Sequence, residues 1–175
     1  MPKALSGPRM VWVCVVLSFH SAHGLEEGST GATPRSTAEV QVALTRLRPG
    51  PYSYVSNSWL QEPKDVVVRT RRDWDQLWPQ ICRSCEEIRL SHLDFERNMV
   101  IVAAMGERRS GGYGIVLESA RETAQRVEIT IREETPGGHG CSATMETTQP
   151  VDVAVMPKIT GNIVFRHHAM QHPCS

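Results

Sequence analysis

The sequence lacks the residue patterns that support known catalytic chemistries. Its 175 residues contain no nucleophile elbow, phosphate-binding loop, H-E-x-x-H zinc motif or paired catalytic carboxylates. Ser110 stands beside two glycines, but its flanks predict strand, turn and strand, whereas a nucleophile elbow joins a strand to a helix. We therefore expect a chain that is not an enzyme, takes no cofactor and holds no metal.

The sequence also has no excess of positive or negative charge and no long apolar run. The chain has 19 Lys and Arg residues against 19 Asp and Glu residues, so its formal net charge is 0. Because nucleic-acid binding needs a clustered basic surface, this composition argues against a nucleic-acid partner. The apolar run at residues 10–19 is too short to span a bilayer, so we expect no stable membrane insertion.

Residues 1–24 have the layout of a secretory signal peptide. A lysine and an arginine precede the apolar run, and Ala22-His23-Gly24 has the small-x-small pattern of a signal-peptide cleavage site. We expect cleavage after Gly24 and export, to a periplasm or to the outside. The mature chain, residues 25–175, then carries 17 basic against 19 acidic side chains, a net charge near −2. A buried N-terminal helix is the alternative.

Four cysteines remain in the mature chain: Cys82, Cys85, Cys141 and Cys174. An even number in an exported protein predicts two disulfides, for which three pairings exist. We favour a local Cys82–Cys85 bridge and a Cys141–Cys174 bridge, the second contributing about 3–4 kcal/mol in the chain-entropy model. The alternatives are a thiol-disulfide oxidoreductase that uses Cys82 and Cys85, and a zinc site that adds His139 and histidines of the tail.

Residues 25–37 are rich in Gly, Ser, Thr and Pro and lack an apolar period, which predicts a flexible leader before a single domain at 38–175. Alternating or continuous apolar runs in that domain predict seven or eight short strands. Eight runs lie at residues 39–47, 66–68, 100–105, 114–118, 127–131, 142–147, 151–155 and 163–165, and residues 52–55 are a further candidate for a short strand. With one helix, they predict a mainly β (α+β) fold: an antiparallel sheet or sandwich with one packed helix.

The chain contains one convincing helix signal, at residues 71–78. Its apolar residues have the spacing of one helix face: Trp74, Leu77, Trp78 and Ile81. Thr70, three residues before Asp73, resembles a capping box. Pro79 limits the helix, because the residue before a proline avoids helical dihedral angles. We expect the helix to end at residue 77 or 78, with a continuation as a looser turn as the alternative. We expect the tryptophans to pack on a sheet that includes residues 100–105; an exposed ligand-stacking pair is the alternative.

Two glycine-bearing loops are the candidate contact surface. In the first, the double glycine marks a sharp bend or a close backbone approach. The tyrosine that follows is either an outward anchor for a partner or a core residue beside a β-bulge, and both readings stay open. The second loop is either a plain hairpin connection or part of the contact surface. The partner-binding candidates are Ser110, Gly111, Gly112, Tyr113, Gly137 and Gly138.

Residues 66–165 resemble the C-terminal domain of the protease-complex subunit PrcB family. The matching features are V-V-V-R-T-x-x-D-W-D-Q-L-W, then L-D-F-E-R-N-M-V-I-V-A-A-M-G-E-R-R-S-G-G-Y, then E-I-T-I-R-E-E-T-P-G-G and Q-P-V-D-V-A-V-M-P-K. The resemblance implies an exported, non-catalytic protein-binding domain that serves as an accessory or stabilising partner of a protease. The chain departs from the family in lacking a clear lipoprotein signal, and its four mature cysteines match no family pattern.

A fainter resemblance connects the two glycine loops to the chagasin-type cysteine-protease inhibitors. Those proteins are immunoglobulin-like sandwiches that insert glycine-bearing loops into a protease cleft. Their tryptophan loop has no obvious counterpart in this sequence. The resemblance implies an alternative function, protease inhibition by insertion of a glycine loop.

Overall fold

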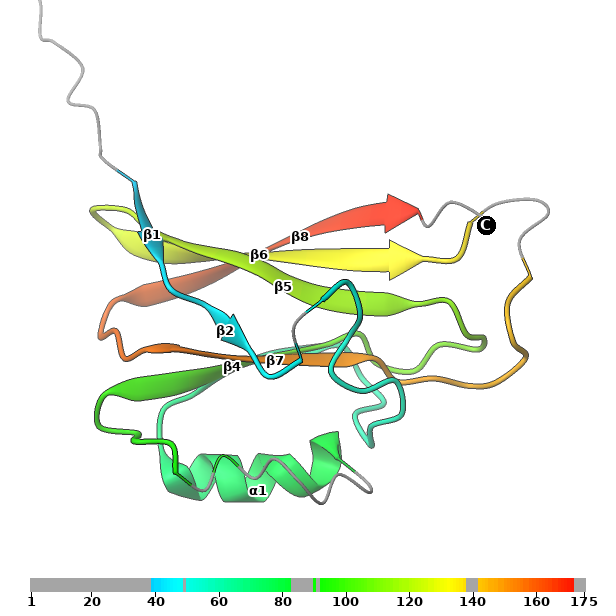
Figure 1. The fold of residues 1–175 in the computed structure, drawn as a ribbon, viewed down its shortest axis with the longest axis horizontal. Helices are drawn as coiled ribbons and strands as arrows, with labels where there is room; N and C mark the ends of the chain where they lie inside the picture. The colour runs from blue at the N-terminus through cyan, green and yellow to red at the C-terminus, as the bar shows by residue number, and fades with distance from the viewer. Residues whose placement is uncertain (1–38, 49, 83–89, 91, 138–141, 172–175) are drawn as a thin grey trace, which may run out of the picture. The chain divides into compact units, whose positions relative to one another are not determined.

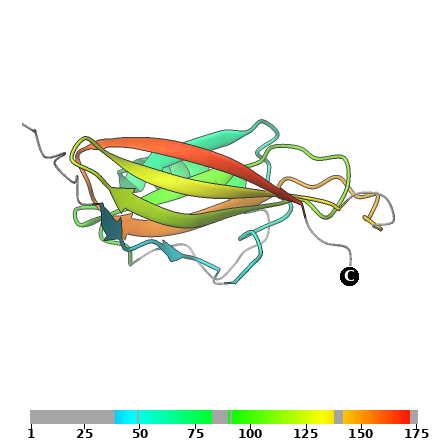
Figure 2. The ribbon, with the colours of Figure 1, turned by 90° about the horizontal axis from the view of Figure 1, so that it is seen from above.

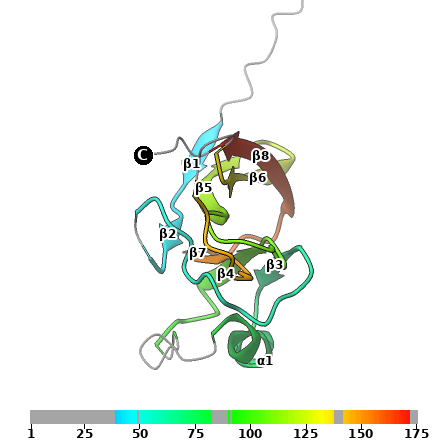
Figure 3. The same cartoon turned by 90° about the vertical axis from the view of Figure 1, so that its right-hand side faces the viewer.

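Two four-stranded sheets lie face to face, and a helix covers the far side of one of them (Figures 1 and 3). The computed structural model describes residues 39–48, 50–82, 90, 92–137 and 142–171. The outer sheet has the order β1 (Val40–Val42), β5 (Gly114–Glu122), β6 (Arg126–Thr135), β8 (Asn162–Gln171). The inner sheet has the order β2 (Thr45–Arg46), β7 (Val151–Pro157), β4 (Asn98–Ala104), β3 (Lys64–Val68), and it carries helix α1 (Arg71–Ile81). Within the described residues, the fold is mainly β with one short helix, as the sequence predicted.

Strand β4 is apolar from Met99 to Ala104 because both of its faces are buried there. Met99, Ile101 and Ala103 point into the core between the two sheets. Val100 and Val102 point into a second core between the inner sheet and α1. A strand covered on one face only would alternate between apolar and polar residues, whereas a central strand covered on both faces does not.

The outer sheet, in contrast, buries one face only. Val127, Ile129 and Ile131 of β6 alternate with polar residues and fill the core between the sheets. On the opposite face, Arg132 lies 2.7 Å from Glu118 and also pairs with Glu134. Figure 2 shows β8, β6 and β5 side by side from above. Strands β6 and β8 run parallel, whereas the other recorded pairs of the described strands are antiparallel.

Helix α1 begins where the sequence predicted and ends later. Thr70 caps it, since the N–H of Asp73 donates to Thr70 Oγ1 at 3.2 Å. The predicted end before Pro79 is wrong, because the helix continues to Ile81. Pro79 costs one backbone hydrogen bond, but Ile81 is completely buried in the helix-covered core, which holds the last turn in place.

The two tryptophans pack as predicted. Trp74 and Trp78 are buried against the inner sheet in the same core as Val100 and Val102. Their ring centroids are 5.1 Å apart. Tyr54, from the connection between β2 and β3, adds a third ring at 6.0 Å from Trp78.

Three predicted strands differ in the structure. Residues 39–47 form two strands in different sheets, because the chain crosses from the outer sheet to the inner one after Val42. Residues 52–55 contribute an isolated bridge at Val55. Residues 142–147 form no strand; they are all exposed, so their alternating pattern has no sheet face to match. No helix of the described chain is long and apolar enough to cross a membrane.

Candidate protein-binding site at the loop end

Three connections meet at one end of the two sheets, which we call the loop end: residues 52–63, 105–113 and 142–150. Backbone bridges join them at Asn57 with Gln149 and at Arg108 with Thr148, and Val55 bridges Val151 at the start of β7. The N–H of Glu107 also donates to the carbonyl of Gln61 at 2.7 Å. Figures 1 and 2 show the green 105–113 segment and the amber 142–150 segment at the right-hand end of the sheets.

Gly111 allows two of these connections to approach closely. The residue is buried, and its N–H donates to the carbonyl of Thr144 at 2.8 Å. A Cβ atom at position 111 would lie only 2.2 Å from Thr144 Oγ1. On the other side, the hydroxyl of Thr148 donates to the carbonyl of Ser110 at 3.0 Å. The backbone of Ser110 and Gly111 therefore braces residues 142–147.

Gly112 of the first glycine loop lies against Pro136, at the start of the second. Gly112 has a φ of +82°, a conformation that disfavours side chains, and a Cβ there would be 3.1 Å from the Cβ of Pro136. Gly137 follows Pro136 and is half-buried, whereas Gly138 lies outside the described residues. The structure thus brings the predicted partner-binding residues together, Gly138 excepted.

Tyr113 is half-buried. It packs against the core between the sheets, and the guanidinium carbon of Arg108 lies 5.8 Å from the centre of its ring. One part of the ring therefore supports the fold, and another part remains accessible at the loop end.

Large apolar side chains are exposed at the loop end or close to it. Met145 is 98% exposed, at the centre of the 142–147 segment. Tyr52 is 63% exposed and Trp59 is 56% exposed. The N–H of Trp59 donates to the carbonyl of Gln80 at 2.7 Å, so this loop is tied to the end of α1. Sequence reasoning missed Met145, because its alternating neighbours predicted a strand.

A buried ion pair holds the connection that carries Tyr52. Arg46 Nε lies 2.6 Å from Asp152 Oδ2, and the same oxygen accepts from the N–H of Leu117 at 2.8 Å. The guanidinium also donates to the carbonyls of Gly50 and Tyr52. Burial raises the pKa of Asp152 above its usual value, and the bonds from Arg46 and Leu117 only partly oppose this shift. Asp152 thus connects the two sheets to the loop, a role that sequence reasoning missed.

A second polar contact closes the opposite edge of the sheets. The two ring nitrogens of His167 lie 2.7 Å from carboxylate oxygens of Asp65 and Glu133. Burial opposes protonation, but the hydrogen bonds and charges of Asp65 and Glu133 outweigh it and raise the pKa of His167. Two acceptors require both ring nitrogens to carry hydrogen, so the contact fits a protonated imidazole. In the described chain, no group of three or more His, Cys, Asp or Glu residues is arranged to hold a metal ion.

Cys82 fits a structural role better than a redox role. Cys82 is disulfide-bonded and is the C-cap of α1. A helix C-terminus disfavours a thiolate, whereas redox cysteines use the N-terminal end of a helix. Cys85, Cys141 and Cys174 lie outside the described residues, as does His139, so both predicted pairings stay predictions.

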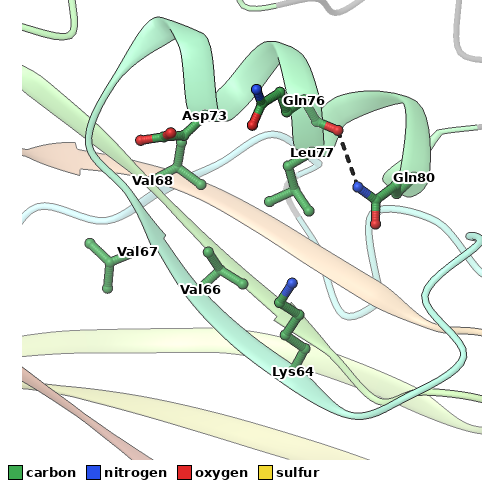
Figure 4. Close-up of a pocket in the computed structure, with 8 residues that line it drawn as sticks. All are labelled: Lys64, Val66, Val67, Val68, Asp73, Gln76, Leu77 and Gln80. Atoms are coloured by element: carbon green, nitrogen blue, oxygen red, sulfur yellow. Dashed lines mark hydrogen bonds between the residues drawn. The ribbon is translucent and has the colours of Figure 1, made fainter.

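A shallow groove of about 260 Å³ lies between β3 and α1 (Figure 4). Val66, Val68 and Leu77 form its apolar floor. Lys64 and Gln80 are among the polar residues at its rim, and the Gln80 side chain donates to the carbonyl of Gln76 at 3.1 Å. The groove lies on the helix-covered side of the inner sheet and contains none of the predicted partner-binding residues.

A comparison with family models finds a match that contains two of the three loop-end segments, residues 105–113 and 142–150. The model described as PrcB C-terminal matches residues 99–157, which run from β4 to the end of β7. No curated protein matches the chain, and no solved structure matches it. The matched segment contains the first glycine loop, its tyrosine and Met145. Over residues 99–157 the match supports the resemblance predicted from the sequence: this segment is similar to the C-terminal domain of the PrcB family.

Proposed function

We propose that the protein is an exported, non-catalytic binding domain that serves as the accessory partner of a protease. The observation that carries the proposal is the PrcB C-terminal match, which spans the braced loops of the loop end. The signal-like layout of residues 1–24 supports export. The family resemblance supports an accessory role rather than a catalytic one.

The composition of the loop end also supports a protein partner. Protein interfaces are enriched in aromatic residues and methionine, and the loop end presents Met145 and part of Tyr113. Backbone hydrogen bonds already hold the 105–113 and 142–150 segments together, so binding would order few additional residues. A rigid surface with exposed apolar side chains is suited to a stable complex.

Affinity capture tests this function. The mature chain, residues 25–175, is immobilised and exposed to the native exported fraction, and captured proteases are identified with active-site probes. A Tyr113→Ala variant reports on the loop end, and an Arg166→Ala variant on the charged outer face of β8 serves as the matched control. Thermal melting of each variant separates lost binding from lost folding.

We expect the wild type and the Arg166→Ala variant to retain a probe-labelled protease, and the Tyr113→Ala variant to retain less of it. Truncation of an interface anchor typically costs about 2 kcal/mol of binding free energy. The absence of any labelled protease above the level of a blank resin would overturn the proposal. Equal capture by all three proteins would move the binding surface away from the loop end.

A further inference from the structure

An edge strand and a helix form the two walls of the groove between β3 and α1 (Figure 4). β3 is the last strand of the inner sheet, and among the described strands it pairs only with β4. No other backbone hydrogen bond is recorded between residues 64–68 and the described chain. Because alternate residues of a strand direct their N–H and C=O groups to opposite sides, the outer edge of β3 can accept one more strand.

The floor of the groove is apolar, and its size suits the side chains of a polypeptide. Val66 is half-buried, Val68 and Leu77 are buried, and all three belong to the core beneath α1. The volume of about 260 Å³ lies below the roughly 300–1,000 Å³ of sites that enclose a small molecule. A strand added beside β3 would direct alternate side chains toward this floor. The groove therefore fits an extended segment better than a cofactor.

The charged groups of the groove lie at its two ends. Figure 4 shows Lys64 and Gln80 at one end and Asp73 at the other. The hydroxyl of Thr70 donates to the carboxylate of Asp73 at 2.7 Å, as part of the helix cap. Lys64 is exposed and makes no hydrogen bond or ion pair with the other described residues. A lysine on an edge strand opposes indiscriminate pairing, so a segment that adds to β3 has to bring an acidic group to this end.

The direction of β3 determines where that acidic group lies in the added segment. β3 runs from Lys64 to Val68 and pairs antiparallel with β4. Antiparallel pairs are the more stable and the more frequent arrangement. A segment antiparallel to β3 has its C-terminal end beside Lys64, so its acidic residue follows its apolar residues.

We propose that the groove between β3 and α1 binds an extended segment of a second protein as a fifth strand of the inner sheet. The apolar side chains of this segment alternate, and an acidic residue follows them. Backbone hydrogen bonds to β3 hold the segment, its apolar side chains cover Val66 and Leu77, and its carboxylate pairs with Lys64. The groove shares no residue with the loop end, and this inference goes beyond the proposed function.

Binding of synthetic peptides to the mature chain, residues 25–175, tests the inference. Each peptide alternates threonine with valine, leucine or phenylalanine and ends with an amidated glutamate, so that the glutamate side chain supplies the carboxylate. A second set ends with lysine instead. A third set carries N-methyl groups on alternate residues, in either register, which removes the N–H groups that a strand donates.

Fluorescence anisotropy gives the dissociation constant of each peptide for the wild type, for Lys64→Glu and for the matched control Arg72→Glu. Arg72 is exposed on α1 and does not line the groove. Lys64 is exposed at the start of β3, so its variant is expected to keep the wild-type melting temperature. If Lys64→Glu does not fold, the comparison of glutamate and lysine peptides on the wild type decides.

We expect the wild type and Arg72→Glu to bind a glutamate peptide about fivefold more tightly than its lysine counterpart, the scale of an exposed ion pair. Lys64→Glu is expected to reverse this preference. N-methylation in one register should weaken binding about tenfold, because it removes backbone hydrogen bonds, and in the other register it should have little effect. In NMR spectra, the peptide should shift the amide signals of residues 64–68 and leave those of residues 105–113 unchanged.

Three results would overturn the inference: no binding of any glutamate peptide to the wild type, equal affinity for the glutamate and lysine peptides, or no effect of N-methylation in either register. A dimer of the mature chain that Lys64→Glu dissociates in sedimentation would assign the groove to a second copy and would also overturn it. Affinity capture at the loop end does not depend on any of these results, so the proposed function is tested separately.

Discussion

The close contact between Gly111 and Thr144 predicts a specific effect of adding one methyl group at position 111. In a Gly111→Ala variant, the new Cβ would lie 2.2 Å from Thr144 Oγ1, far inside the contact distance. The next nearest atoms of Thr144 would be 3.5 and 3.6 Å away, which are ordinary contacts. One hydroxyl is therefore the whole obstruction. We expect a loss of about 1–2 kcal/mol in the free energy of unfolding, the usual range for moderate overpacking.

The same geometry predicts that a second substitution rescues the first. Thr144 is exposed, so Thr144→Ala alone should change the free energy of unfolding by less than about 0.5 kcal/mol. It also removes the hydroxyl that meets the new Cβ. The double variant Gly111→Ala, Thr144→Ala should therefore lie within about 0.5 kcal/mol of Thr144→Ala, a coupling that additive effects cannot produce.

Two measurements compare the wild type, the two single variants and the double variant. Urea denaturation gives the free energy of unfolding of each variant, and hydrogen exchange of the amide at position 111 reports its 2.8 Å bond to the Thr144 carbonyl. Gly111→Ala should speed this exchange, and the double variant should restore it. The reasoning is refuted if Gly111→Ala behaves like the wild type, or if the double variant is as unstable as the single one.

The remaining predictions concern the cores and the buried polar contacts. Trp78→Ala should cost about 3–5 kcal/mol by calorimetry, because the ring is buried against the inner sheet; an unchanged melting temperature would contradict that packing. Since the pKa of His167 is raised above 6.5, its contribution to stability is fully present below pH 6.5 and is lost as the pH rises through the raised value. Melting curves across this range should show the loss in the wild type and in the control His168→Gln, but not in His167→Gln. Asp152→Ala should cost about 3–5 kcal/mol, because it leaves Arg46, with a side chain only 12% exposed, buried without its carboxylate; a loss below 1 kcal/mol in urea denaturation would contradict this role.

Local sequence patterns were sufficient to predict the strands and the helix whose residues are buried on one face or on both. The continuous apolar run of β4 predicted a central strand, and the helical spacing of Trp74 and Trp78 predicted a packed helix. Both patterns can be recognised locally, because the residues that form each one belong to a single strand or helix. The end of α1 was missed, because tertiary burial of Ile81 outweighed the local effect of Pro79.

The features that the sequence did not reveal depend on partners far along the chain. Asp152 stands between two valines, and nothing in this local pattern marks it as buried, but both faces of β7 are buried, and its partner Arg46 is 106 residues away. The alternation at 142–147 resembled a strand, yet the segment is a protruding connection. Its position becomes clear only when Gly111 and Thr144 are seen in contact.

Hydrogen exchange of the mature chain, alone and bound to its captured protease, tests the central claim most directly. The account predicts that binding slows exchange at residues 105–113 and 142–150 and leaves α1 and the outer face of β8 unchanged. Slowed exchange confined to α1 or to the outer sheet, with the loop end unaffected, would contradict it.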